Sequence, residues 1–245
     1  MTHGELVTLE AHGSALQVLR NGTIKQWTPH GLVTLIDDSH FTKSGISATV
    51  RAADGSTVES WHLTDRRSTF GVPGLVFENT LPGLSMYFEM IFASHLTLSL
   101  SVRNTGTQPT TVEEEIAFNL FVGDIKDVQI EGIAMASFKE SEGGREKQIY
   151  DDLTFVGPTN SLVFTQDPIQ IIDPRGRMAM SIAKFGSSTT RFWTPWEKAI
   201  IEDGSEVGWD HYLQICPGNE NVGRVLLQPN ELHTMSVDLY VETLG

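Results

Sequence analysis

Alternation of apolar and polar residues over short segments recurs along most of the sequence and limits what the chain can fold into. In the segment from His95 to Arg103, the residues Leu96, Leu98, Leu100 and Val102 alternate with Thr97, Ser99, Ser101 and Arg103. A period of two indicates a β-strand with one buried face, because successive strand side chains point to opposite sides of the sheet. No helical period extends beyond about three turns, the usual length of a helix. The segment that best fits a helix, residues 196–202, is short.

Turn signals between these segments favour antiparallel pairing. Asn21-Gly22 separates two short apolar segments, and Asp54-Gly55 lies in the middle of residues 46–64. Both dipeptides tolerate the positive φ angles of tight hairpins. The segments 85–93 and 95–103 predict a further antiparallel pair. Many short strands joined by turns predict an all-β fold, a large antiparallel β-sandwich with at most one or two short helices.

Length and apolar content are sufficient for one such domain. The chain has 245 residues, of which 40% are hydrophobic, so it can bury a large core. Length alone permits one large all-β domain or two small ones. We expect residues 1–245 to form a single β-sandwich domain.

Charge and cysteine content limit the partners and the compartment. The formal net charge of -14 at pH 7 argues against nucleic acid and anionic lipid as general partners. No apolar stretch approaches membrane-spanning length, so we expect no membrane insertion. The first residues lack a signal-peptide pattern, and the single cysteine excludes an internal disulfide. These features favour the cytoplasm or another reducing compartment, an organelle stroma included.

The segment from Thr111 to Val122 has one polar side. Five of its residues point away from the apolar side: Glu113, Glu115, Ala117, Asn119 and Phe121. Carboxylates and an amide on one sheet face suggest a polar, concave surface, and Glu115 and Asn119 are candidates for ligand contacts. The acidic run at residues 113–115 as a whole is interpreted as a solvated surface.

Residues 188–218 combine two short strands with an acidic insert. The strands are expected to pair, which makes the insert a long loop over one end of the sheet, and such loops often carry function. Strand parity places Cys216 beside Tyr212 and Gln214. Cys216 is interpreted as a packed thiol, because a reactive one needs a lowered pKa. His211, next to Asp210, is a candidate substitute acid.

Several motifs resemble hexose-6-phosphate mutarotases (glucose-6-phosphate 1-epimerases), a family of the galactose mutarotase-like superfamily. Residues 193–199, Trp-Thr-Pro-Trp-Glu-Lys-Ala, are similar to its Trp-Asn-Pro-Trp…Glu-Lys-Ala segment, and residues 122–125 match its Val-Gly-Asp-Ile. Residues 215–218, Ile-Cys-Pro-Gly, lie where the family has Val-Glu-Pro-Gly. The resemblance covers roughly residues 85–245 and, weakly, 9–36. Residues 40–80 do not resemble the family's sugar-contacting His-Gly-Phe-Ala-Arg region.

The resemblance implies anomer interconversion by a glutamate base and a histidine acid, but this chain lacks both. Cys216 occupies the position of the glutamate, and Ala117 occupies that of the histidine, or Glu115 does under an alternative alignment. Asn160 and Ser161 replace an aspartate–arginine pair. Acid–base chemistry at an anomeric carbon needs two groups on opposite sides of that carbon. The resemblance therefore implies a divergent member in which that chemistry has been lost.

Three functions stay open at this point. The first is a catalytically degenerate carbohydrate-binding protein, the second an active aldose or glucose-6-phosphate 1-epimerase with Glu115 and His211 as relocated catalytic groups. The third is a non-catalytic subunit or scaffold for a protein partner. Candidate contacts to a sugar or sugar phosphate are Asn119, Glu115, Asn160, Arg191, Trp193, Gln214 and Cys216.

Alternative roles remain for some of these side chains. Arg191 with Arg175 and Arg177 could hold a phosphate or form surface ion pairs. Trp193 and Trp196 could stack on a sugar or pack in the core. No cofactor and no metal site is expected, because the histidines form no His-x-His or His-Glu-x-x-His pattern.

Overall fold

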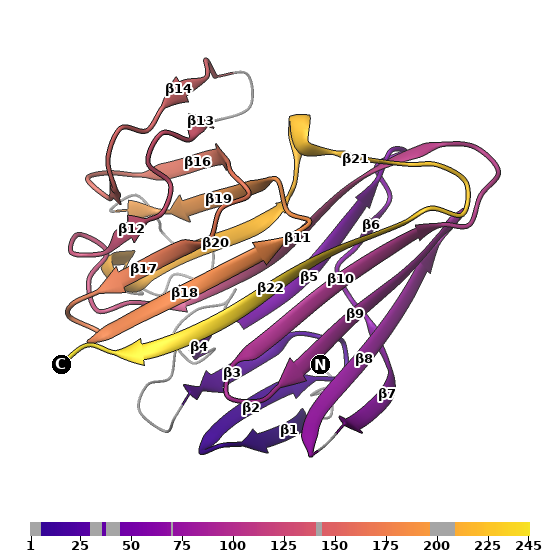
Figure 1. Cartoon of the computed structure of the whole chain (residues 1–245), viewed down its shortest axis with the longest axis horizontal. Coiled ribbons are helices and arrows are strands. Elements are labelled where there is room, and N and C mark those ends of the chain that lie inside the picture. Colours follow the sequence, from indigo (N-terminus) through magenta and orange to yellow (C-terminus); the bar gives the residue numbers. More distant parts are fainter. Residues whose placement is uncertain (1–5, 30–35, 38–44, 70, 141–143, 197–208) are drawn as a thin grey trace.

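Two antiparallel sheets build the protein in a computed structural model (Figure 1). The structure describes residues 6–29, 36–37, 45–69, 71–140, 144–196 and 209–245. The expected all-β antiparallel sandwich is confirmed: the described residues contain no α-helix, and their short 3-10 turns include η3 (Trp209–His211) and η4 (Asn221–Gly223). None of the described helices is long and apolar enough to cross a membrane.

The first sheet has thirteen strands among the described residues. In spatial order they are β1 (Leu6–Ala11), β2 (Ser14–Leu19), β3 (Ile24–Thr28), β5 (Gly45–Ala52), β11 (Thr110–Phe121), β20 (Tyr212–Asn219), β19 (Thr189–Thr194), β16 (Thr159–Phe164), β13 (Ser137–Lys139) and β14 (Lys147–Gln148). Three short strands are added beside this path: β4 (Ile36–Asp37) on β3, β6 (Thr57–Val58) on β5, and β21 (Val225–Leu227) on β11.

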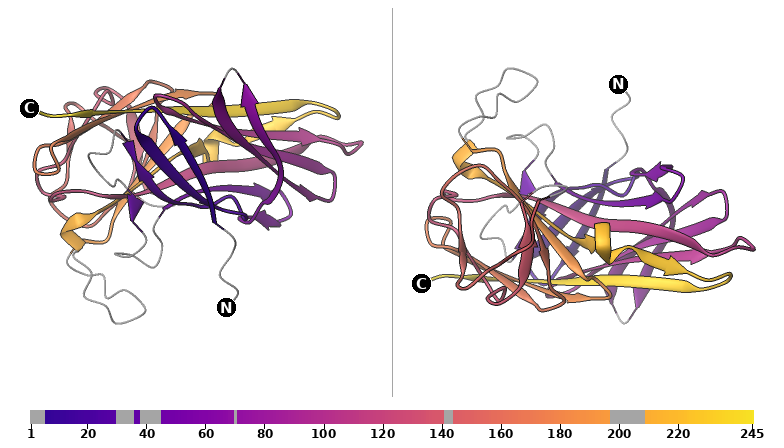
Figure 2. Two further views of the ribbon diagram at one scale, coloured as in Figure 1. Left: turned by 90° about the horizontal axis from the view of Figure 1, so that it is seen from below. Right: turned by 90° about the horizontal axis from the view of Figure 1, so that it is seen from above.

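The second sheet has nine strands in the described part of the chain. Their order is β15 (Leu153–Thr154), β12 (Gln129–Glu131), β17 (Ile169–Asp173), β18 (Met178–Phe185), β22 (Leu232–Thr243), β10 (Leu96–Asn104), β9 (Leu84–Phe92), β8 (Val72–Leu81) and β7 (His62–Thr69). Seen edge-on, the two sheets form two layers, with β22 in yellow on one side of the molecule (Figure 2). We call the side of the thirteen-stranded sheet turned away from this layer the outer face.

One continuous apolar core lies between the sheets. The apolar side of β11 and the alternating leucines of β10 are fully buried in it, as the period of two predicts. The expected pairs 85–93 with 95–103 and the two strands around the acidic insert are confirmed as β9–β10 and β19–β20. The Asn21-Gly22 hairpin is also confirmed, with Gly22 at a φ of 85°. Residues 197–202 of the proposed helix and most of the acidic insert lie outside the described residues.

The predicted hairpin over residues 46–64 is only partly correct. β5 pairs with β6 at two positions, Val50 with Val58 and Arg51 with Thr57. The chain then leaves the first sheet, and β7 pairs with β8 in the second. The buried Trp61 explains the crossing, because its indole packs 5.7 Å from the ring of Phe88 and its Nε1 donates to the Ala48 carbonyl at 2.9 Å. Burial of this large side chain draws the segment into the core between the sheets.

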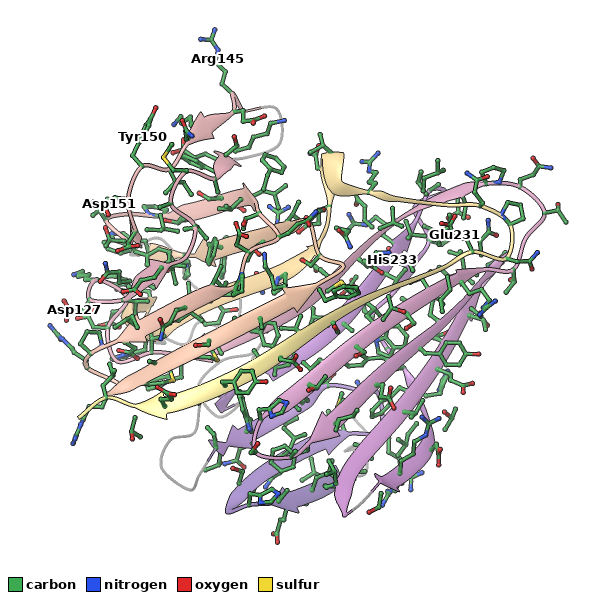
Figure 3. All side chains as sticks on the ribbon, in the orientation of Figure 1. Asp127, Arg145, Tyr150, Asp151, Glu231 and His233 are labelled. Carbon is green, nitrogen blue, oxygen red and sulfur yellow. The ribbon has the colours of Figure 1, made fainter. Side chains whose placement is uncertain are left out.

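The interpretation of the whole acidic run as solvated is wrong for Glu114. Its side chain is fully buried on the inner side of β11, opposite to Glu115. Its Oε1 lies 2.8 Å from His233 Nε2 and accepts from Asn219 Nδ2 at 2.8 Å. His233 lies near the start of β22 (Figure 3), so this contact joins the two sheets. Buried carboxylates need such partners.

Substitution of Gly123 by alanine is expected to lower the free energy of unfolding by about 2–3 kcal/mol. An added Cβ would lie 2.3 Å from the backbone nitrogen of Gly176, in the turn after β17. This contact holds the Val-Gly-Asp-Ile segment on that turn, where Asp173 accepts hydrogen bonds from the backbone N–H groups of both glycines, at 2.7 and 2.8 Å. Urea denaturation measures the loss. Gly157→Ala is the matched control, since its Cβ would meet nothing within 4 Å, and an equal loss there would contradict the steric explanation.

Candidate functional site

A row of side chains crosses four adjacent strands on the outer face. In the register of the sheet, Asn119 of β11 pairs with Gln214 of β20, Gln214 with Trp193 of β19, and Trp193 with Asn160 of β16. Their neighbours Phe118, Ile215 and Phe192 are buried in the core, so these four side chains point outward.

A second row lies next to the first. It consists of Ala117, Cys216 and Arg191, because Cys216 pairs with Arg191 and the register of β11 with β20 puts Ala117 opposite Cys216. Glu115 pairs with Gly218 and lies one row further along β11. All seven residues predicted to contact a sugar therefore come from one face and four neighbouring strands. The sequence places them far apart, from residue 115 to residue 216, and antiparallel pairing brings them together.

Asn119 uses its polar atoms within the protein. Its Oδ1 accepts from the Tyr212 hydroxyl at 2.5 Å and from Gln214 Nε2 at 2.8 Å, and its Nδ2 donates to the Gly45 carbonyl at 3.0 Å. An amide oxygen with two donors has no further lone pair to offer. Asn119 therefore orients Tyr212 and Gln214 rather than presenting an acceptor to a ligand. Burial raises the pKa of the Tyr212 hydroxyl, which stays protonated and donates.

Trp193 forms one wall of a pocket of about 610 Å³. Its indole contacts the Tyr212 ring edge-on at 5.4 Å and is half-buried. We call this the tryptophan pocket; it is lined by Glu140, Pro158, Thr159, Asn160, Ser161, Trp193, Thr194 and Pro195. Trp196 does not line it and instead packs 5.2 Å from Trp209, with Lys126 Nζ above both rings. The two tryptophans of the resemblance motif thus have different environments.

A second pocket, of about 450 Å³, contains arginines and glutamates in equal number. We call it the charged pocket; it is lined by Arg51, Glu113, Glu115, Arg191, Gln214, Cys216, Glu220, Asn221 and Arg224. Arg191 is ion-paired with Glu220 and donates from Nη1 to Asn160 Oδ1 at 3.0 Å. Arg224 and Arg51 bind the two oxygens of Glu113 at 2.7 and 3.2 Å.

Glu115 differs from the other two carboxylates of the charged pocket. Among the described residues its carboxylate forms no hydrogen bond or ion pair. Desolvation, together with the nearby negative charge of Glu220, raises its pKa to about 7, while Arg191 and Arg51 act in the opposite direction. A carboxyl group that titrates near neutral pH in a pocket is a frequent property of functional sites.

Cys216 forms the floor of the charged pocket with 2% of its surface exposed. Burial, with the nearby carboxylates Glu115 and Glu220, raises the pKa of its thiol well above the ordinary value. A nucleophilic cysteine needs the opposite shift. This environment fits the interpretation of Cys216 as a packed thiol.

His211 does not meet Glu115. Its ring stacks on Phe121 at 5.1 Å between centroids, and its Nδ1 lies 2.9 Å from the carbonyl oxygen of Val122. Glu115 and Phe121 are six residues apart on one strand, a separation of about 20 Å. These two candidates for relocated catalytic groups therefore cannot act together on one anomeric carbon.

The three arginines considered for phosphate binding are also separated. Arg175 lies in the turn between β17 and β18 of the second sheet, where it is paired with Asp124 at 2.9 Å and Asp127 at 2.5 Å. The guanidinium groups near Arg191 are instead those of Arg51 and Arg224, which the sequence did not single out. Arg51 pairs in register with Glu113, so only knowledge of the β5–β11 pairing could have placed it here. Within the described ranges, no three His, Cys, Asp or Glu residues are grouped as metal ligands.

The two antiparallel sheets match the galactose mutarotase-like sandwich fold. Comparison of the sequence with models of protein families and with curated proteins gives no match. Comparison of structures gives YeaD of Salmonella typhimurium, described as a candidate mutarotase, at TM-score 0.80 and 12% identity, with 97% of this chain and 90% of that chain covered.

Two further structures agree with this assignment of the fold. A galactose mutarotase-like protein from Lactobacillus casei has TM-score 0.75 and 8% identity, covering 97% of this chain and 100% of that one. The GalM/aldose epimerase homologue from C. elegans has TM-score 0.70 and 9% identity, covering 98% and 99%. The fold implied by the sequence motifs is thereby confirmed.

Proposed function

We propose that the protein binds a carbohydrate on the outer face of the thirteen-stranded sheet and does not interconvert sugar anomers. The observation that supports this proposal is the row Gln214–Trp193–Asn160, which Asn119 orients at one end, with Arg191 beside it. Amide groups, a guanidinium group and an aromatic side wall are the usual means of holding hydroxyl groups and the apolar side of a sugar ring.

The pairing of the other carboxylates supports the non-catalytic part of the proposal: among the described residues of the charged pocket, Glu113 and Glu220 are bound to arginines and only Glu115 has no ion pair. Ring opening and closure need a base and an acid on opposite sides of the anomeric carbon. Glu115 can serve as one of them, but among the described histidines the candidate His211 lies about 20 Å along the strand. In the alignment implied by the sequence motifs, the buried thiol of Cys216 takes the place of the family's glutamate, and Ala117 or Glu115 takes that of its histidine.

An active 1-epimerase is the second candidate function, and the raised pKa of Glu115 favours it. A carboxyl group with a pKa of about 7 can accept and return a proton at neutral pH. If the substrate is a hexose 6-phosphate, the phosphate would lie near Arg51 and Arg224, whose exposed guanidinium groups flank the charged pocket. A role as a subunit or scaffold stays a third proposal, with the outer face unused.

Exchange NMR and calorimetry with the same sugars separate these functions. The probes are glucose, galactose and glucose 6-phosphate. Under the first proposal, at least one of them binds and none shows anomer exchange faster than buffer. Exchange that accelerates with protein, and that is lost in Glu115→Gln, would establish the epimerase instead. No binding across the panel would favour the scaffold.

Trp193→Ala is expected to weaken sugar binding about tenfold, because an aromatic side chain at the centre of a site often contributes that much. Calorimetric titration with the best-binding sugar measures this change. Tyr87→Ala is the control: Tyr87 is 41% exposed on β9 of the other sheet, remote from the outer face. Equal affinities for the wild type and Trp193→Ala would show that Trp193 does not contribute to sugar binding.

A further inference from the structure

The charged pocket and the tryptophan pocket lie next to each other on the outer face. Their common border is the hydrogen bond from Arg191 Nη1 to Asn160 Oδ1, at 3.0 Å. Arg191 lines the charged pocket and Asn160 lines the tryptophan pocket. The register supports the same arrangement, since Gln214 of the first pocket pairs directly with Trp193 of the second. The two pockets therefore form one site that crosses the strands.

The length of this site exceeds one sugar ring. From β11, which carries Glu115, to β16, which carries Asn160, there are three inter-strand spacings, or about 14 Å. Each pocket, at about 450 and 610 Å³, is within the range that encloses a small organic ligand by itself. A monosaccharide in one of them would leave the other without a ligand.

The lining of the tryptophan pocket indicates what its ligand is. Its polar groups are the amide of Asn160 and the hydroxyls of threonines and a serine, and its apolar surface comes from Trp193 and two prolines. Its one charged residue, Glu140, is ion-paired with Lys147 at 2.7 Å. No arginine or lysine is among the described lining residues, so a phosphate has no cation to bind there. Neutral hydroxyl groups and a ring face are what this lining complements.

We propose that the ligand is an oligosaccharide of at least two units, with one sugar in the charged pocket and the next, an uncharged sugar, in the tryptophan pocket. This inference rests on the proposed carbohydrate binding and adds the length and the charge of the ligand. It also assigns Asn160 to the second unit and Gln214 and Arg191 to the first, with Trp193, which pairs directly with Gln214, between the two units and in contact with both.

Saturation-transfer NMR and calorimetry with glucose, maltose, cellobiose, galactose and lactose test this proposal. We expect at least one disaccharide to bind about tenfold more tightly than its monosaccharide, with saturation received by protons of both rings. The blocking variant is Pro195→Trp, which adds an indole at a residue that lines the tryptophan pocket just after β19. It should reduce the affinity for the disaccharide to that of the monosaccharide and leave the monosaccharide unchanged.

A second blocking variant keeps the test valid if the first variant does not fold. Pro158→Trp changes an exposed residue before β16 and should have the same selective effect. Monosaccharides that bind as tightly as disaccharides, or disaccharide binding that neither variant reduces, would overturn the two-unit ligand while leaving carbohydrate binding intact. Absence of binding for every sugar would overturn the proposed function and this inference together.

Discussion

Replacement of Glu114 by leucine is expected to lower the free energy of unfolding by about 3 kcal/mol, as measured by urea denaturation. The carboxylate is fully buried and binds both His233, on the other sheet, and Asn219. Removing one partner of a buried pair leaves the other uncompensated, which usually costs more than the pair contributes. The expected cost is at the lower end of the usual range, because His233 is 24% exposed and can release its proton.

The loss should depend on pH through His233. Its hydrogen bond to Glu114 raises the pKa of the imidazole above its ordinary value, although burial acts in the opposite direction. A raised folded pKa means that this stabilisation is complete below the unfolded pKa of about 6.5 and is lost as pH rises through the folded value. The difference between wild type and Glu114→Leu should therefore be larger at pH 6 than at pH 9.

Glu113→Gln is the matched control for this prediction. Glu113 is one residue away, and its partners Arg51 and Arg224 have side chains that are 58% and 59% exposed. Ion pairs of this kind contribute about 1 kcal/mol or less. Equal losses for Glu113→Gln and Glu114→Leu, or a Glu114→Leu loss that does not change with pH, would contradict the role of the buried pair.

The contrast between neighbouring glutamates shows what the sequence can predict about this fold. The period of two predicts that residue 114 shares the inner side of β11 with Val112 and Ile116. Because Glu114 lies between two other glutamates, the sequence does not show that its side chain is buried. Its partners, Asn219 and His233, belong to strands more than 100 residues later in the chain, so no local sequence pattern predicts these contacts. The alternation of residues and the turn dipeptides predict the strands and the local hairpins. The crossing of the chain from the first sheet to the second at Trp61 cannot be predicted in this way, because it depends on burial in a core that both sheets form together.

The candidate site divides in the same way. Parity within one strand places Glu115 with Asn119 and Cys216 with Gln214, and the sequence motifs add Asn160, Arg191 and Trp193. Which of these polar atoms can still bind a ligand depends on the tertiary contacts of each side chain. Asn119 is fully hydrogen-bonded to its neighbours, and His211 is held at the far end of the strand by Phe121. Arg51, Glu220 and Arg224 enter the pocket only through pairing between distant strands.

Replacement of Glu115 by glutamine is expected to have the opposite sign to the Glu114 change and to stabilise the protein by about 2 kcal/mol at pH 8. Desolvation and Glu220 raise the pKa of the carboxyl group from 4.5 to about 7, so ionising it costs more in the folded than in the unfolded state. The figure is discounted for the part of this half-buried group that water reaches. Glutamine keeps the shape and carries no charge to desolvate.

The pH dependence of this gain follows from the sign of the shift. Since the folded pKa is raised, the unfolded chain loses its proton first, and wild-type stability falls between about pH 4.5 and pH 7. The advantage of Glu115→Gln should therefore be about half as large at pH 5.5 as at pH 8. Measurements below that range approach the isoelectric point of about 4.9, where solubility is lowest.

A stabilising Glu115→Gln change would also bear on function. If the protein is more stable with an amide at this position, the carboxylate lowers stability. Groups that lower stability are typical of functional sites, where they bind a ligand or transfer a proton. Two measurements separate these roles: a lower sugar affinity of Glu115→Gln indicates a contact between the carboxylate and the ligand, whereas loss of anomer exchange at unchanged affinity indicates proton transfer. A stability that is unchanged at pH 8 would mean that water or an ion already solvates Glu115, and the argument from its raised pKa would fail for both roles.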